Sequence, residues 1–135
     1  MAEFVRLSEA TALALHTMAL VAAAKGGAVS VAGLASELSA SESHLSKVMQ
    51  RLAKAGFLRA KRGPNGGYTL GHPAGEISLL AIYEAMEGPI RRDECLFVAP
   101  VCRRGECILG DLVGRVRREV RTYLEQTTLR DLTEN

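Results

Sequence analysis

Apolar residues recur along most of this chain at the three- and four-residue spacing of amphipathic helices. Helices are expected over about 8–24, 31–38, 42–55, 78–86 and 108–126. Serine stands at the expected start of the first three, as Ser8, Ser30 and Ser41, where its hydroxyl can accept a bond from a free backbone N–H. The chain is therefore predicted to be mainly helical.

A different pattern lies between the third and fourth helices. Residues 57–62 and 68–70 are predicted to be two short strands, and the intervening turn 63–67 contains three glycines and Pro64. Two short helices joined by a three-residue turn and followed by such a hairpin form a winged helix-turn-helix. The predicted fold is mainly α, with a two-stranded wing and a long C-terminal helix.

Composition agrees with helix packing and adds a charge asymmetry. Of 135 residues, 47% are apolar but only 4% are aromatic, so the core must consist mostly of Leu, Val and Ala. Residues 25–75 hold seven lysines and arginines against two acids, whereas residues 76–135 hold nine against eleven. A basic surface is therefore expected on the winged part, where a polyanion such as DNA would bind.

The third helix is narrow enough for the major groove, and the wing is expected to contact phosphates or the minor groove. From the helix, the candidate DNA contacts are Ser41, Ser43, His44, Lys47 and Arg51. From the wing, they are Arg59, Lys61, Arg62, Asn65, Gly66, Gly67 and Tyr68. A winged helix can also serve as a protein-interaction module, and this is the alternative.

Three cysteines, Cys95, Cys102 and Cys107, lie within thirteen residues between the wing and the last helix. Thiolates favour iron–sulfur clusters, zinc and copper(I). Zinc sites usually contain close cysteine pairs, whereas gaps of six and four residues suit a loop around a larger cluster. Ordinary free cysteines and thiol-based redox sensing are the alternatives.

The chain is thus expected to contain a DNA-binding domain over 1–87, a cluster-binding loop over 88–107, and a dimerisation helix with a tail over 108–135. The last helix carries an apolar stripe over 109–124, which suits a dimer core, with packing inside one chain as the alternative. Four arginines of this helix are expected to form a solvated face, namely Arg115, Arg117, Arg118 and Arg121.

The odd number of cysteines argues against the closed disulfide framework of a small secreted protein. The apolar run 10–24 could be a signal-peptide core, but His16 and two threonines interrupt it, and it is too short to span a bilayer. We expect a buried first helix in a cytoplasmic protein that does not enter a membrane.

Several segments resemble the Rrf2 family of bacterial regulators. They are Leu7-Ser8-Glu9, Ser43-His44-Leu45-Ser46-Lys47-Val48, Arg62-Gly63-Pro64-Asn65-Gly66-Gly67-Tyr68, and the three cysteines, so the resemblance covers nearly the whole chain. It implies a homodimer that crosses its C-terminal helices, reads a near-palindromic operator and carries a 2Fe–2S or 4Fe–4S cluster.

Carried over residue by residue, the resemblance makes the cluster ligands Cys95, Cys102 and Cys107. Glu9 stands where the NsrR-like branch has an acidic residue that reaches the cluster of the partner subunit, so Glu9 is the candidate fourth ligand. Glu94 and Asp111 are weaker candidates. The IscR-like branch has a histidine at the position of Gly110, so the chain resembles the NsrR-like branch more closely.

The leading hypothesis is a cluster-dependent DNA-binding repressor that senses nitric oxide, redox state or cluster supply. The alternative is a cluster-free winged-helix regulator that uses its thiols or a partner protein, as a cysteine-metabolism repressor would. A scaffold or electron carrier that does not bind DNA is a third hypothesis, which salt-sensitive DNA binding would exclude. An enzyme is not expected, because no nucleophile–base pair, phosphate loop or paired carboxylates stand out.

Overall fold

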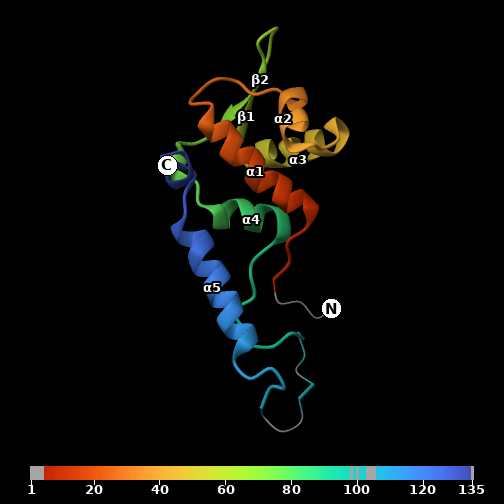
Figure 1. Ribbon diagram of the computed structural model, residues 1–135, viewed down its shortest axis with the longest axis vertical. Helices are drawn as coiled ribbons and strands as arrows, with labels where there is room; N and C mark the ends of the chain where they lie inside the picture. Colours follow the sequence, from red (N-terminus) through yellow and green to blue (C-terminus); the bar gives the residue numbers. More distant parts are fainter. Residues whose placement is uncertain (1–4, 98, 100, 103–105, 135) are drawn as a thin grey trace.

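The computed structural model describes residues 5–97, 99, 101–102 and 106–134 of the chain (Figure 1). The helices are α1 Glu9–Ala23, α2 Val31–Leu38, α3 Glu42–Lys54, α4 Leu79–Glu87, α5 Leu112–Gln126 and α6 Leu129–Thr133. The strands are β1 Leu58–Lys61 and β2 Gly67–Leu70, and a short 3-10 turn, η1, covers Ala74–Glu76. The predicted mainly helical fold with a two-stranded wing is confirmed.

Serine side chains cap the N-terminal ends of the first four helices, as the sequence predicted for three of them. The bonds run from Thr11 N to Ser8, from Gly33 N to Ser30, from His44 N to Ser41 and from Ala81 N to Ser78. Each bond satisfies a backbone donor that has no partner within its helix. The helix starts are therefore set by local chemistry.

The core lies where α1 crosses the helix-turn-helix and α4. Met18 of α1 is completely buried, as are Leu45 and Met49 of α3. The i, i+4 spacing of the last two places them on one face of their helix, which packs against α1 and α2. The opposite face of α3 is left to solvent.

The wing is fastened to the segment that precedes α2. Leu58 pairs with Leu70 and Lys61 with Gly67 in the antiparallel hairpin. On the other side of β2, Val29 N donates to Tyr68 O at 2.9 Å and Tyr68 N donates to Val29 O at 2.8 Å. A Cβ atom on Gly67 would lie 2.5 Å from the Val29 carbonyl oxygen, so only glycine allows this approach.

The C-terminal part differs from the prediction in two ways. Helix α5 begins at Leu112 rather than at about 108, because Gly110 adopts a left-handed φ of +59° in the turn before it. Helix α6 was not predicted. It returns to the winged part, where Leu129 is completely buried, Leu79 N donates to Thr127 O at 2.9 Å and Leu129 N donates to Ile77 O at 3.0 Å.

The two candidate functional regions lie at opposite ends of the elongated molecule (Figure 1). The hairpin projects at one end beside α2 and α3, and the cysteine-bearing loop before α5 forms the other end. Helix α5 runs from that loop back to α4, against which it packs. Among the described helices, none is both long and apolar enough to cross a bilayer.

Candidate DNA interface and cysteine site

Helix α3 presents a polar surface at the end of the molecule that carries the wing. Ser43 and Lys47 are exposed, and His44 is half-buried beside them. The Ser41 hydroxyl is occupied as a helix cap, since it accepts from His44 N at 3.1 Å. The groove-facing role of these side chains stays a prediction.

Arg51 has partners within the chain. Its guanidinium donates to the carbonyl oxygens of Met86 at 3.2 Å and Ala85 at 3.5 Å, at the C-terminal end of α4. Free carbonyls at a helix end attract cations, which explains why the side chain turns this way. Arg51 therefore joins α3 to α4, and a DNA contact would have to use its remaining donors.

Gln50 is a candidate base reader that the sequence analysis did not single out. It is exposed on α3, seven residues after Ser43 and three after Lys47, so all three share one face. Its amide nitrogen donates to the Ser46 hydroxyl at 3.3 Å. Glutamine can form two bonds with adenine in the major groove. The seven-residue spacing was the signal that could have identified it.

The wing displays exposed cations and a tightly folded turn. The exposed side chains are those of Arg59, Lys61, Arg62 and Asn65. Gly66 closes the turn, because a Cβ there would overlap the Lys61 carbonyl oxygen. Tyr68 is half-buried and packs against the core. The wing glycines thus have a folding role, whether or not they also approach DNA.

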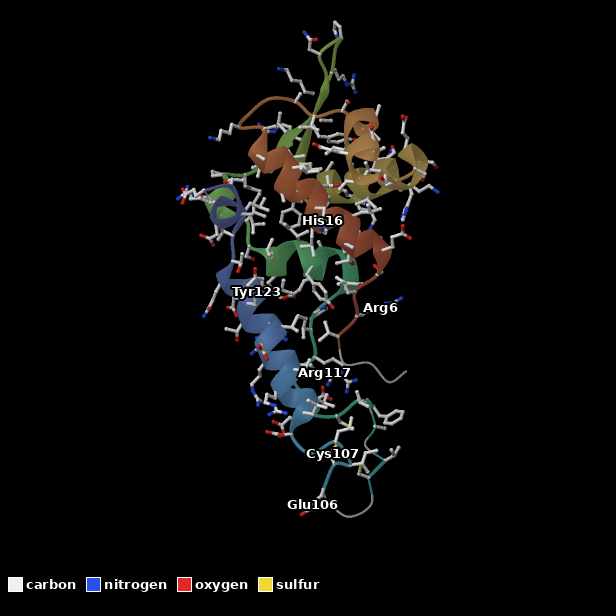
Figure 2. The ribbon with its side chains drawn as sticks, viewed as in Figure 1. Arg6, His16, Glu106, Cys107, Arg117 and Tyr123 are labelled. Carbon is white, nitrogen blue, oxygen red and sulfur yellow. The ribbon has the colours of Figure 1, made fainter. Side chains whose placement is uncertain are left out.

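The three cysteines line one cavity of about 680 Å³ at the far end of α5. Four carboxylates share its wall, those of Asp93, Glu94, Glu106 and Asp111. Glu106 and Cys107 lie together at this end of the molecule in Figure 2. The two weaker candidates for a fourth ligand, Glu94 and Asp111, are therefore close to the cysteines.

The thiol and carboxylate groups that line this cavity are suitable ligands for an iron–sulfur cluster, because thiolates are the usual cluster ligands and carboxylates also bind iron. Within the described part of the chain, no three His, Cys, Asp or Glu side chains converge closely enough to hold a metal ion. Glu9 is exposed in the first turn of α1 and is not among the described residues that line the cavity. The prediction that Glu9 binds the cluster of the partner subunit involves a second chain, so it stays a prediction.

The prediction that four arginines of α5 form a solvated face is wrong for Arg117. Its side chain is only 3% exposed, whereas those of Arg115 and Arg118 are 62% and 61% exposed. Arg121 is half-buried and donates to the Ile90 carbonyl oxygen. The described partners of Arg117 and Arg121 lie more than twenty residues away, so no local charge pattern could reveal them.

Arg117 and Arg91 hold the segment around Cys95. Arg117 donates to the Cys95 carbonyl oxygen at 2.6 Å, to the Asp93 carbonyl oxygen at 3.0 Å and to the Asp93 carboxylate at 3.1 Å. Arg91 donates to the same carboxylate. This hydrogen bond from Arg91 keeps the pKa of Asp93 below its usual value, helped by the charges of both arginines and opposed by partial desolvation.

A second, smaller cavity of about 230 Å³ lies beside the cysteine loop and is lined by Arg91, Arg92, Arg117, Arg118 and Arg121. Five guanidinium groups around one space repel one another. The acids Asp93 and Glu94 partly offset this repulsion, and Glu94 pairs with Arg118 at 3.1 Å. The loop and the start of α5 therefore depend on each other electrostatically.

Comparison with known proteins identifies the chain. Its residues 7–135 match the Rrf2 family, described as "Iron-dependent Transcriptional regulator". The chain belongs to the Rrf2 family. Because members of this family are DNA-binding transcription regulators, the predictions of a transcription regulator and of a protein that is not an enzyme are both confirmed.

Relatives of this Rrf2 protein carry names of the same kind. A protein of Haemophilus influenzae named as a helix-turn-helix-type transcriptional regulator is 34% identical over 110 residues, which are 81% of this chain and 73% of the relative. One from Neisseria meningitidis serogroup B, similarly named, is 30% identical over 111 residues, covering 82% and 75% of the two chains.

Solved structures give the same result for the fold. The chain resembles CymR, the global cysteine regulator of B. subtilis, with a TM-score of 0.80 and 30% identity over 96% of this chain and 97% of that one. It resembles Staphylococcus aureus CymR with a TM-score of 0.76 and 32% identity over 95% and 98%. IscR of T. potens shares the fold, with a TM-score of 0.74 and 23% identity over 96% and 87%.

Proposed function

We propose that this Rrf2 protein is a homodimeric repressor whose affinity for operator DNA depends on an iron–sulfur cluster. The observation that carries the proposal is the single cavity that Cys95, Cys102 and Cys107 line together. A bound cluster would supply an iron centre that reacts with nitric oxide or oxidants. The thiolates would hold it, and the neighbouring carboxylates are candidates for a fourth ligand.

The arrangement of the chain supports coupling between this cavity and DNA. Helix α5 begins five residues after Cys107 and packs against α4. The last carbonyls of α4 accept hydrogen bonds from Arg51 of the recognition helix α3. A homodimer must place its two recognition helices about one DNA turn, roughly 34 Å, apart. A small change in the cysteine loop that moves α5 would alter this spacing on both half-sites at once.

The dimer is proposed to form through α5. The exposed Tyr123, with 60% of its surface accessible, and the half-buried Val116 and Val120 lie on this helix outside the main core. An apolar stripe that one chain leaves partly open suits a second copy of the same helix.

A cluster-free regulator is the second candidate. Similarity to CymR favours it, because B. subtilis CymR is named as a cysteine regulator and a structure of an oxidized form of the S. aureus protein resembles this chain at 30% identity. In this function the three thiols would respond to oxidants, or a partner protein would carry the signal.

Anaerobic reconstitution with iron and sulfide separates the two candidates. The cluster function predicts brown protein with bound iron and sulfide, loss of visible absorbance in Cys102→Ser, and a changed affinity for operator DNA after nitric oxide treatment. Ser36→Ala, an exposed change on α2, is the control and should keep the absorbance of the wild type. Colourless wild-type protein after reconstitution would contradict the cluster function and favour the thiol-based one.

A further inference from the structure

We propose that Arg117 is the positioning residue for Cys95, because its buried guanidinium holds the backbone carbonyls of Asp93 and Cys95 and ties them to α5. Figure 2 shows Arg117 on α5 near the cysteine loop. The purpose assigned to this contact rests on the proposed cluster function, whereas the contact itself does not.

Burial makes Arg117 unlike its neighbours on the helix. Arginine is almost never fully buried unless it is paired, because its charge must be taken out of water. At 3% exposure, Arg117 lies beneath the loop, and one of its terminal nitrogens contacts two backbone carbonyls, those of Asp93 and Cys95. A single rigid group therefore fixes the peptide unit before Glu94 and the peptide unit after Cys95.

Arg91 holds the backbone that follows Cys95. It donates to the carbonyl oxygens of Leu96 at 3.2 Å and Phe97 at 2.9 Å. Both arginines also bind the Asp93 carboxylate. We call Arg91, Asp93 and Arg117 the arginine clamp. The clamp arginines thus donate to four backbone carbonyls around the cysteine, those of Asp93, Cys95, Leu96 and Phe97.

The surroundings of Cys107 are held differently. Gly110 N donates to the Cys107 carbonyl oxygen at 3.0 Å, and Leu109 N donates to its sulfur at 3.4 Å. These are local turn contacts, whereas Arg117 joins Cys95 to a helix 22 positions further along the chain. Among the contacts of the described residues, Cys95 is the cysteine that a side chain of α5 holds directly.

A preset ligand favours binding because less of the loop has to be ordered when the ligand arrives. The same contact would carry a displacement of Cys95 directly to Arg117 and so to α5. Lysine could not replace this residue fully, since it offers a point charge and not a planar group with five donors.

The test uses cluster-free, reduced protein and measures how fast each cysteine reacts with Ellman's reagent, resolved by mass spectrometry. In Arg117→Met, Cys95 should react about tenfold faster, the amount that corresponds to losing one charged hydrogen bond. Cys102 and Cys107 should keep their rates within about twofold, less than any single hydrogen bond contributes. Arg117→Lys should give an intermediate rate for Cys95.

Arg115→Met is the matched control. Arg115 lies on the same helix, its side chain is 62% exposed, and its 4.0 Å ion pair with Asp111 is at the surface. All three cysteines should keep their wild-type rates in this variant. Asp93→Asn removes the exposed member of the clamp, since the Asp93 side chain is 47% exposed. It should also make Cys95 react faster with the reagent while the rates of the other two cysteines stay unchanged.

Unchanged Cys95 rates in both Arg117→Met and Asp93→Asn would overturn the proposal, and so would equal acceleration of all three cysteines in Asp93→Asn. If Arg117→Met fails to fold, the Asp93→Asn result decides alone. Selective acceleration in protein that takes up no iron would support the positioning role and refute the cluster function, so the two ideas fail separately.

Discussion

At the scale of single residues, the informative side chains of this protein are those whose partners lie far along the chain. The charge pattern of α5 indicated four equivalent arginines, yet Arg117 is buried while Arg115 is exposed. What distinguishes them is contact with Asp93 and Cys95, more than twenty residues earlier. Sequence alone could identify the three cysteines as candidate ligands, but it could not show what holds Cys95 in place.

Asp93 gives a prediction about pH. Its folded-state pKa is lowered, first by the hydrogen bond from Arg91, so the clamp contributes stability that is fully present above the ordinary carboxyl pKa of 3.8. That contribution is lost only as the pH falls through the lowered value. NMR titration of the Asp93 carboxyl carbon should therefore give a midpoint below 3.8, the ordinary value for the group, and Arg91→Gln should raise it. A wild-type midpoint at or above the ordinary value would refute the clamp geometry.

At the scale of helices and strands, local signals were sufficient where local chemistry decides the structure. Serine caps and apolar spacing predicted α1 to α4 closely, because a cap bond joins residues only three positions apart. The pairing of Val29 with Tyr68 and the five-residue helix α6 were missed, since both depend on contacts between distant segments. Gln50 was missed although its spacing from Ser43 was visible in the sequence.

The wing and α3 are predicted to contribute differently to DNA binding. Arg59→Ala and Arg62→Ala should weaken binding to all sequences and reduce the salt slope by about one unit for each phosphate that the variant no longer neutralises. His44→Ala should instead narrow the difference between operator and random DNA, by about 1–3 kcal/mol if it reads a base edge. Fluorescence anisotropy at several salt concentrations measures both effects.

Ser36→Ala, an exposed and uncharged change on α2, serves as the control and should change neither property. If His44→Ala keeps both its affinity and its sequence preference, the proposed orientation of α3 in the groove is wrong.

At the scale of the whole molecule, the winged part is completed by the C-terminal end of the chain. The predicted division at residue 87 separates segments that share a core, because Leu129 lies among the buried residues of α1 and α4 and its backbone pairs with Ile77. Helix α5 is thus fastened at both ends, by the clamp at the cysteine loop and by Thr127 at Leu79.

Leu129→Ala should lower the free energy of unfolding by about 2–5 kcal/mol, the usual cost of removing a fully buried leucine. Leu132 lies on the same short helix but is 39% exposed, so Leu132→Ala should cost clearly less. Urea denaturation of both variants, followed by circular dichroism, provides the comparison. Equal losses in the two variants would mean that α6 does not dock as described.

The docking of α6 also limits how this protein can be engineered. A chimera that takes only the first 87 residues and fuses them to a foreign sensor would leave an open apolar socket where Leu129 belongs. Such a hybrid should aggregate unless residues 127–134 are grafted back in after the inserted module. The sensor is therefore best exchanged as an internal insertion between α4 and α6, with both flanks of the winged part retained.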